Sequence, residues 1–196
     1  MKRAFDLFFT IIGLLVLSPF FLIIVFLVKF DSKGGSFYFQ KRVGQNNKDF
    51  VLIKFRTMEI DSDKKGLITI GNNDARITKI GYYLRKYKID ELPQLINVFW
   101  GEMSLVGPRP EVRKYVNLYT IEQKKVLSVQ PGITDFASIK FRNENEILAK
   151  SANPNKCYVE DIMPEKLKLN IIYIEKMSLV TDFKIIIFTI ISVIKK

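Results

Sequence analysis

Two adjacent carboxylates, Asp90 and Glu91, are the residues best placed to do chemistry. They lie in KIDELPQLIN (88–97), where Asp90 is predicted to cap a helix over 90–100, with Pro93 in its first turn. The positive end of that helix would keep Asp90 ionised and attract phosphate. Ionised Asp90 is a poor base but a usable nucleophile toward phosphorus, and Glu91 could hold a divalent cation. The dipeptide alone favours a plainer interpretation, a capped helix with one extra surface acid.

A stiff loop presents an arginine shortly afterwards. Residues 104–111 read SLVGPRPE, so Pro108 and Pro110 flank Arg109. Each proline fixes its own φ, and Pro110 also biases Arg109 toward an extended backbone. An arginine held this way loses little backbone entropy when it grips a phosphate. The alternative is an ordinary surface turn with a solvated guanidinium.

Four more basic residues lie before or after these two motifs along the chain. Lys54 and Arg56 alternate with apolar residues and are expected to project from one face of a strand, while Arg85 lies shortly before Asp90. Arg142 follows the turn at QPGIT (130–134). Each alone is typical of a solvated surface charge. Together with the two acids, they predict a site for a doubly phosphorylated, metal-bound ligand.

Composition narrows the chemistry. The 196 residues include no histidine, which excludes imidazole bases and His-containing zinc sites, and one cysteine, Cys157, which excludes an intrachain disulfide. A Cys157 nucleophile would lack an imidazole partner. Lys and Arg number 31 against 20 Asp and Glu, for a net charge of +11, yet 48% of residues are hydrophobic. This pairing disfavours a disordered tail and indicates an apolar segment plus a basic surface facing an anionic partner.

The apolar segment comes first. Leu7–Val28 carries no charge and is long enough as a helix to cross a bilayer core, with Ser18 and Pro19 near its middle. Proline should bend the helix there, and the serine hydroxyl can satisfy a freed carbonyl. Basic residues flank both ends, which favours placing both ends in the cytoplasm. A helix that breaks at Ser18-Pro19 and re-enters fits this, and so does a single kinked crossing.

The remaining segments are shorter. Residues 35–57 alternate around a Gly-Asn-rich turn and predict a hairpin, and 59–75 predict a mobile surface loop. Helices are expected over 76–88, 111–128 and 164–177, the last with Leu167, Ile171, Tyr173 and Ile174 inward. Residues 179–194 are apolar but short for a crossing. They are expected to lie flat at a membrane interface or to pack into the core.

Several motifs in this order resemble one family. KFRTM (54–58), IDELPQLINVFWGEMSLVGPRPE (89–111), QPGIT (130–134) and TDFKI (181–185) together are similar to the bacterial sugar transferases, the small monotopic phosphoglycosyl transferases. The resemblance covers nearly the whole chain. One stretch departs from it: PGITDFASIKFRNE (131–144) differs from the family pattern at Asp135, Ser138 and Phe141. The altered loop suggests a subgroup with a different sugar or nucleotide contact.

The resemblance implies a predominantly helical α+β fold with a short hairpin. Residues 1–30 would form a re-entrant broken membrane helix, 31–178 a cytosolic catalytic domain with amphipathic interfacial helices, and 179–196 a C-terminal helix on the core or the interface. Asp90 would be the nucleophile, Glu91 would help position Mg²⁺, and Arg85 and Arg109 would bind phosphate. The other three cations, Lys54, Arg56 and Arg142, would lie around the site.

The implied activity moves a sugar 1-phosphate from a UDP-sugar to undecaprenyl phosphate, the first membrane step of surface-glycan assembly such as capsule or lipopolysaccharide. The partners are then both substrates and the bilayer, with no nucleic acid, on the cytoplasmic face of the bacterial inner membrane; a homodimer is compatible with this. A different function class is a non-catalytic basic adaptor that binds anionic lipid or nucleic acid. It explains the charge and the anchor but not the fixed spacing of DELPQL and GPRP.

Overall fold

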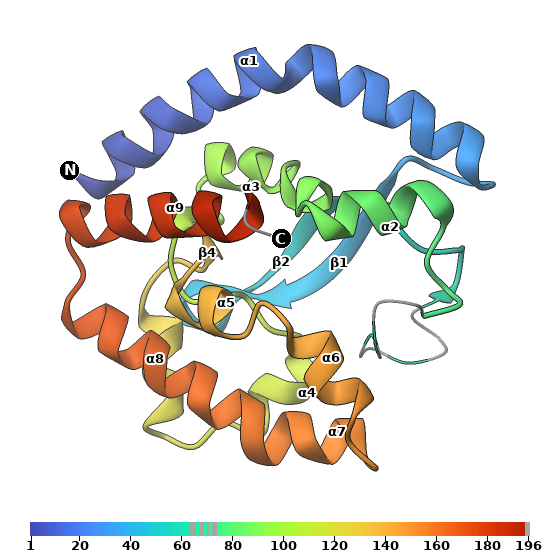
Figure 1. The fold of residues 1–196 in the computed structure, drawn as a ribbon. Coiled ribbons are helices and arrows are strands. Elements are labelled where there is room, and N and C mark those ends of the chain that lie inside the picture. Colours follow the sequence, from blue (N-terminus) through green and yellow to red (C-terminus); the bar gives the residue numbers. More distant parts are fainter. Residues whose placement is uncertain (63–65, 67–68, 70, 72–73, 195–196) are drawn as a thin grey trace.

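Helices dominate the architecture, with two small two-stranded sheets between them (Figure 1). The computed structural model describes residues 1–62, 66, 69, 71 and 74–194. Its α-helices are α1 Lys2–Asp31, α2 Lys79–Lys86, α3 Gln94–Trp100, α4 Arg113–Val116, α5 Phe136–Lys140, α6 Glu144–Ala149, α7 Pro154–Cys157, α8 Met163–Glu175 and α9 Leu179–Ile194. Its strands are β1 Phe37–Val43, β2 Asp49–Phe55, β3 Ser104–Val106 and β4 Gly132–Thr134. The predicted α+β class with predominant helix is confirmed.

The N-terminal segment is one continuous helix. α1 runs through Pro19 without interruption and arches over α3 and α2 (Figure 1). Pro19 has no N–H for the carbonyl of Leu15, and the Ser18 hydroxyl donates to that carbonyl at 2.9 Å instead. The expected rescue by Ser18 is therefore confirmed, whereas the expected break is wrong: the helix curves because the serine replaces the missing bond.

Polar side chains attach both ends of α1 to the rest of the molecule. Near its start, Lys2 forms an ion pair with the buried Asp182 of α9 at 2.6 Å, and the buried Asp6 accepts hydrogen bonds from the Ser104 hydroxyl and the Leu105 N–H. At its end, Asp31 accepts the N–H of Ile80 in the first turn of α2 at 2.8 Å. The helix is therefore fixed at two points, and the arch between them is its least buried part.

The predicted hairpin is confirmed. β1 and β2 pair antiparallel from Phe37 opposite Phe55 to Val43 opposite Asp49. Asn97 of α3, fully buried, joins the hairpin to the helix above it: its amide oxygen accepts the Ile53 N–H at 3.1 Å and its amide nitrogen donates to the Val51 carbonyl at 2.7 Å. The Asn97 side chain thus pairs with the backbone of β2 as a neighbouring strand would. This pairing fixes α3, and the segment just before α3, relative to the hairpin.

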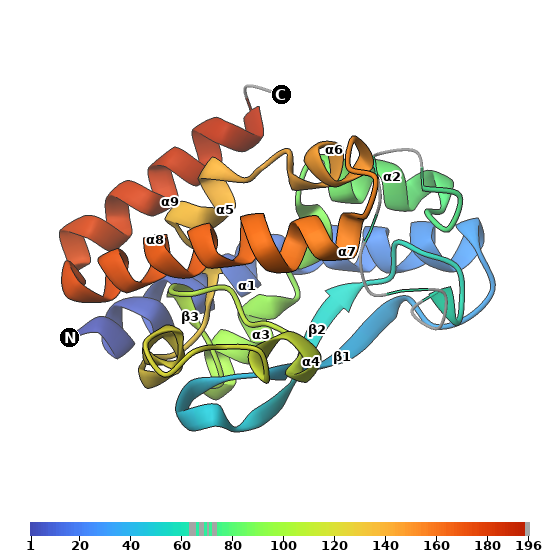
Figure 2. The same cartoon turned by 90° about the horizontal axis from the view of Figure 1, so that it is seen from below.

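The largest core cluster lies between α8, α4 and the end of β1. In the view from below, α8 runs across the molecule between α9 and the hairpin (Figure 2). The predicted helix over 164–177 is confirmed by α8, with Leu167 and Tyr173 buried and Ile171 and Ile174 packed against the core. The cluster consists of Val43, Val112, Tyr115, Val116, Tyr119, Val126, Leu148, Tyr158, Ile162, Met163 and Leu167.

The single helix predicted over 111–128 is wrong. The segment forms α4 and then a separate 3₁₀ turn over Gln123–Ser128. Between them Thr120 and Gln123 cap each other: the Gln123 side chain accepts the Thr120 N–H, and the Thr120 hydroxyl accepts the Gln123 N–H. α4 has already ended at Val116, and this reciprocal cap starts a separate turn after it, so the segment does not form one helix.

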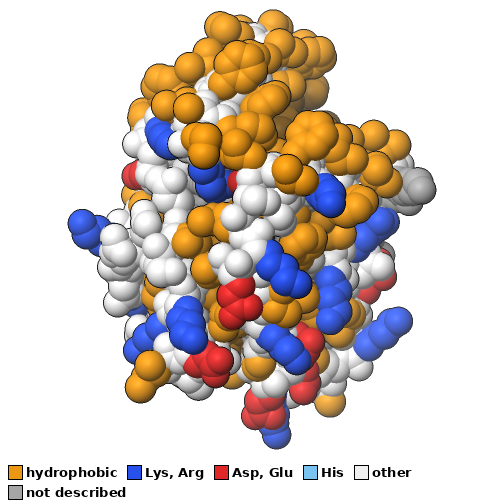
Figure 3. Space-filling view, turned by 90° about the vertical axis from the view of Figure 1, so that its left-hand side faces the viewer, with side chains coloured by type: hydrophobic (Ala, Val, Ile, Leu, Met, Phe, Trp, Pro, Cys, Tyr) orange, Lys and Arg blue, Asp and Glu red, His pale blue; other side chains and the backbone are white. Residues whose placement is uncertain are grey.

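The last helix packs on one side only. Ile185 and Asp182 of α9 are buried against β3 and α8, whereas Phe183 and Phe188 are about half exposed. Hydrophobic side chains gather over α1 and α9, and charged ones over the opposite half of the molecule (Figure 3). Packing into the core is therefore confirmed for one face of α9, and the interfacial placement of its other face stays a prediction. Of the predicted loop over 59–75, residues 63–65, 67–68, 70 and 72–73 lie outside the described residues.

Candidate functional site

Two sequence motifs form one rigid unit beneath α1. The GPRP loop (107–110) and the PGIT turn (131–134) lie side by side, because β3 and β4 pair in parallel. Gly107 N–H donates to the Thr134 carbonyl, and Gly132 N–H donates to the Pro108 carbonyl, both at 3.0 Å. A Cβ at Gly132 would lie 2.0 Å from the Gly107 nitrogen, so only glycine permits this approach. The stiffness predicted for the arginine loop therefore comes from this pairing as well as from its prolines.

A buried aspartate then fixes the arginine itself. Asp135 is fully buried; one of its carboxylate oxygens accepts the Arg109 backbone N–H at 3.2 Å, and the other accepts the Ser138 N–H to cap α5. Asp135 is one of the residues that depart from the family pattern, and its role in positioning Arg109 was not predicted from the sequence. An available signal was the spacing from Asp135 to Ser138, which is typical of a helix cap.

The carboxylate dipeptide does not cap a helix as predicted. The chain leaves α2 through Lys88, whose φ of 57° is left-handed, and then makes a 3₁₀ turn over Ile89–Glu91. The helix predicted to open at Asp90 begins instead at Gln94, and no side chain caps it. Asp90 is buried, and its Oδ1 has no hydrogen-bond partner among the described residues. The turn at Lys88 thus leaves a carboxylate oxygen buried and unpaired.

Glu91, by contrast, is fully paired. Arg109 binds it with both terminal nitrogens, Nη1 at 3.0 Å from Oε2 and Nη2 in close contact with Oε1, and Lys54 Nζ lies 3.0 Å from Oε1. Burial opposes its charge, but Arg109 and then Lys54 hold the pKa of Glu91 well below its usual range. Burial lowers the pKa of Lys54 to about 8, against the opposing effect of Glu91.

The two neighbouring acids therefore titrate in opposite directions. Burial, followed by the charge of Glu91, raises the pKa of Asp90 above its usual value, although Lys54, Lys88 and Arg85 partly offset the effect. The helix dipole expected to keep Asp90 ionised does not start at this residue, because α3 begins at Gln94. Pairs of carboxyls whose environments separate their pKa values are typical of sites with two different chemical roles.

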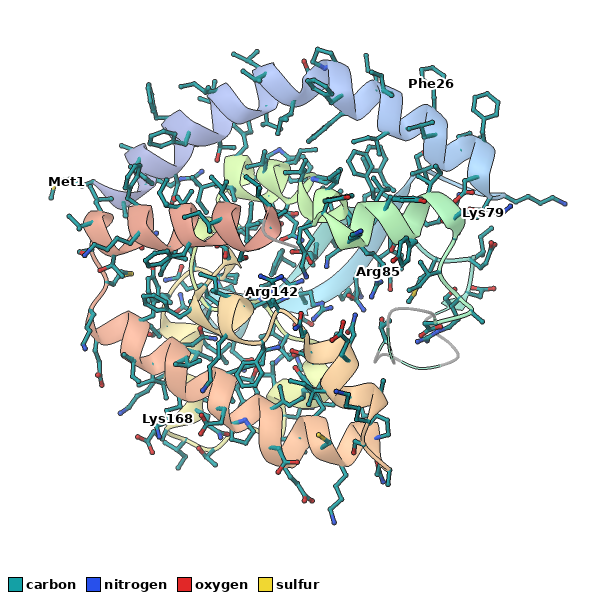
Figure 4. The ribbon with its side chains drawn as sticks, in the orientation of Figure 1. Met1, Phe26, Lys79, Arg85, Arg142 and Lys168 are labelled. Carbon is teal, nitrogen blue, oxygen red and sulfur yellow. The ribbon has the colours of Figure 1, made fainter. Side chains whose placement is uncertain are left out.

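The remaining predicted cations divide into two groups. Arg85 of α2, which donates to the Thr69 hydroxyl at 2.9 Å, and Arg142, which follows α5, both line one cavity with Asp90, and they lie near the centre of the molecule (Figure 4). Arg56 serves a different purpose. β2 ends at Phe55, and the Arg56 guanidinium donates to three carbonyls of the segment after α1, those of Ser32, Lys33 and Gly35. β2 ends before Arg56, so the strand face predicted to be shared with Lys54 is not formed, yet both residues line the larger cavity described next.

Two cavities meet at Asp90. The smaller has a volume of about 280 Å³ and also contains Glu91 and Arg142; the larger, about 620 Å³, extends toward α8. Both are lined by the same junction residues, Lys54, Arg85, Asp90, Arg109, Glu144, Asn145 and Lys166. A junction with four cations and one unpaired carboxylate oxygen suits an anionic ligand that extends into both spaces.

Comparison with known proteins identifies the family. The family model described as "Bacterial sugar transferase" matches residues 1–196. The chain belongs to the bacterial sugar transferase family. It is 39% identical over 158 residues to the exopolysaccharide production protein ExoY of Sinorhizobium fredii, a match that covers 73% of this chain and 70% of that protein. It is 37% identical over 190 residues to EpsL of Bacillus subtilis, named an uncharacterized sugar transferase, covering 97% of this chain and 85% of EpsL.

A longer relative carries a more specific name. The chain is 34% identical over 197 residues to the UDP-glucose:undecaprenyl-phosphate glucose-1-phosphate transferase of Klebsiella pneumoniae. That match covers 96% of this chain but only 39% of the relative. The relatives support the predicted enzyme class, a transferase, over essentially the whole chain.

The junction of this sugar transferase fits a divalent cation only in the company of a phosphate. Among the described residues, no three His, Cys, Asp or Glu side chains converge as a metal site. Asp90 Oδ1 is unpaired, whereas both oxygens of Glu91 are bonded to cations. Mg²⁺ commonly binds one or two carboxylates and completes its shell with substrate phosphates and water. The donor set present here matches that pattern, and the predicted role of Mg²⁺ stays a prediction.

Substituting the two neighbouring carboxylates should change the stability of the transferase in opposite directions. In chelator at pH 8, Asp90→Asn should raise Tm, because it removes a buried charge, and this gain should shrink as the pH falls through the raised pKa of Asp90. Glu91→Gln should lower stability by about 3 kcal/mol, because Arg109 loses its partner; that loss should diminish at acid pH, where Glu91 itself is protonated. Thermal unfolding of the purified protein across pH measures both.

The exposed pair between Lys140 and Glu165 supplies the control. Glu165→Gln should leave Tm nearly unchanged at every pH, because exposed ion pairs contribute little. If the Asp90 and Glu91 variants shifted Tm in the same direction at pH 8, the assignment of opposite environments to the two acids would be wrong.

Proposed function

We propose that this transferase moves a sugar 1-phosphate from a UDP-sugar to undecaprenyl phosphate through a covalent intermediate on Asp90. The observation that carries the proposal is the buried Asp90 oxygen without a partner, at the junction of two cavities and among Lys54, Arg85 and Arg109. The name of the Klebsiella relative describes the same donor class, acceptor and transferred group. The product would enter exopolysaccharide assembly, as the name of ExoY suggests for that relative.

The first half-reaction uses Asp90 as the nucleophile. Ionised Asp90 Oδ1 attacks the phosphorus that carries the sugar, a P–O bond to the aspartyl oxygen forms, and the bond to the bridging oxygen breaks so that UMP leaves. Burial raises the pKa of Asp90, so the ionised oxygen is more basic than that of a solvated aspartate. Lys54, Arg85 and Arg109 hold the negative charge that develops on the phosphate oxygens.

The second half-reaction restores the enzyme. A phosphate oxygen of undecaprenyl phosphate attacks the same phosphorus, and the bond to Asp90 breaks. Atoms and charge balance, because UMP has already left and the lipid phosphate supplies the new oxygen. No general base is required, since both nucleophiles are already anions; this agrees with the absence of histidine from the chain.

Asp90 and Glu91 would hold the Mg²⁺ that this chemistry uses. When bound, the ion would neutralise charge on the donor's pyrophosphate and stabilise the leaving phosphate. Glu91 is bonded to Arg109 and Lys54, so it would ligate the ion only if Arg109 turned to the donor's phosphate.

Removal of divalent cations should stop product formation. With excess chelator, the labelled lipid described below should not form, because two carboxylates and a pyrophosphate would repel one another at the junction. Mg²⁺ added beyond the chelator should restore the rate. Undiminished formation of the labelled lipid in chelator would rule out a requirement for a divalent cation.

The proposed activity predicts a specific labelled product. Protein incubated with UDP-sugar labelled in the sugar and with undecaprenyl phosphate should transfer the label to the lipid and release UMP. Asp90→Asn should abolish turnover while Tm is retained or raised. The matched control is Asp161→Asn, which changes an exposed carboxylate and should leave the rate unchanged.

A basic adaptor of the same charge would retain the lipid but make no labelled product. Near-normal turnover by Asp90→Asn would contradict the assignment of Asp90 as the nucleophile, even if the wild type forms the labelled lipid.

We further propose that the protein is monotopic, on the cytoplasmic face of the bacterial inner membrane. α1 is long and apolar enough to cross a membrane, and only 11% of its most apolar stretch is buried. Yet Lys2 and Asp6 near the start of α1 are bonded to α9 and β3, and Asp31 at its end is bonded to α2. A straight crossing would pull one end away from these partners. A helix that dips into one leaflet, curved at Ser18-Pro19, keeps both.

Labelling should place both ends of α1 on one side of the membrane. Single cysteines at residue 1 and at residue 33, in a Cys157→Ser background, should both react from the cytoplasmic side of spheroplast-derived vesicles. A cysteine at the exposed Lys168 of α8 serves as the cytoplasmic reference. Labelling of residues 1 and 33 from opposite sides would establish a true crossing instead.

A further inference from the structure

The far end of the larger cavity has a different chemical character from the junction. It is lined by Tyr115, Tyr119 and Tyr158, together with Leu148, Met163 and Leu167. All six belong to the largest core cluster, so their positions are fixed by packing. The charged groups beside these residues are paired with each other, since Glu111 binds Arg42 and the Tyr158 hydroxyl. Such a surface suits a neutral planar group better than a phosphate.

One polar group at this end lacks a partner. Asn170 of α8 is 4% exposed and lines the larger cavity, and its Oδ1 has no hydrogen-bond partner among the described residues. A buried amide oxygen without a partner costs about 1–3 kcal/mol. Any ligand that places an N–H against it recovers this energy. The cavity therefore combines aromatic walls with one hydrogen-bond acceptor that is free to bind a ligand.

The junction determines how a nucleotide-sugar would divide between the two cavities. With its pyrophosphate beside Asp90, Lys54 and Arg109, the nucleoside and the sugar must extend in opposite directions. The smaller cavity is lined by charged and polar groups, among them Arg142 and Ser138, whose hydroxyl is also buried without a partner. That lining suits a polyhydroxyl sugar. The aromatic walls and the larger volume suit the nucleoside.

We propose that the larger cavity is the nucleoside subsite, in which Asn170 Oδ1 accepts the imide N–H of the donor's uracil and the three tyrosines bound the base. This inference rests on the proposed function and adds to it the place and the recognition of the base. It also gives a role to Asn170, whose buried oxygen is unpaired on a helix whose other buried residues are apolar or hydrogen-bonded.

Comparison of two ligands isolates the base. The full-length protein in detergent should bind UMP about tenfold more tightly than ribose 5-phosphate, which lacks the base, because one hydrogen bond and the aromatic contact are lost. Asn170→Leu, similar in size but without the amide, should remove most of that preference and leave the affinity for ribose 5-phosphate unchanged. Calorimetric titration measures both. Asn117→Leu, at an exposed asparagine, should behave as the wild type.

A measurement on the wild-type chain does not depend on the folding of a variant. Irradiation with 4-thiouridine 5′-monophosphate should give adducts in the segments 111–119, 158–163 or 167–170, which line the larger cavity alone, and excess UMP should suppress them. Adducts in 136–142, which lines the smaller cavity alone, would place the base there and overturn the proposal.

The two hypotheses fail in different ways. If the wild type makes the labelled lipid but Asn170→Leu keeps the full preference for UMP, the subsite is wrong and the proposed function stands. If the wild type neither binds UMP nor makes the lipid, the proposed function fails, and the subsite fails with it.

Discussion

Arg109 donates two hydrogen bonds to Glu91, and Lys54 adds a third from the hairpin. Because Glu91 takes these cations, the adjacent Asp90 is left buried with a free oxygen. The same ion pair lowers the pKa of Glu91, and the charge of Glu91 helps to raise the pKa of Asp90. One interaction thus separates two chemically similar residues into a group whose pKa is lowered and a group whose pKa is raised. An unpaired buried carboxylate destabilises the fold, and sites that destabilise the fold are commonly those that function requires.

Several backbone and side-chain hydrogen bonds of the fold hold Arg109 in position. The backbone of the arginine loop is bonded to β4 through Gly107 and Gly132, and Asp135 fixes the Arg109 N–H from the start of α5. The hairpin brings Lys54 to the other side of Glu91, and Asn97 ties the hairpin to α3. These connections join segments that are far apart in the sequence, so the electrostatics of the site depend on the tertiary fold as a whole.

This dependence separates what the sequence could predict from what it could not. The hairpin, α8 and the residues around Asp90 follow from local patterns, since alternation, helical spacing and the DELPQL and GPRP segments are contiguous. The environment of Asp90 does not: a local rule made it a helix cap, but the left-handed Lys88 shifts the helix start to Gln94. Arg56 is a similar case, because its carbonyl partners after α1 are brought to it only by the fold. The reciprocal cap at Thr120 was visible in the sequence and was overlooked in predicting 111–128.

The junction holds a single set of cations, whereas the proposed reaction brings three phosphate groups to them in turn. A nucleotide pyrophosphate and a lipid phosphate bound together would compete for Arg109 and Lys54 and would repel each other across a buried site. Storing the sugar phosphate on Asp90 removes this conflict, because UMP can leave the larger cavity before the lipid phosphate arrives. Both ends of α1 are bonded to the domain that holds the junction. With the proposed monotopic placement, the depth of α1 in the lipid would therefore also set the height of Asp90 relative to the headgroups. On this view the covalent intermediate is a consequence of having one phosphate site to serve a soluble donor and a membrane-bound acceptor.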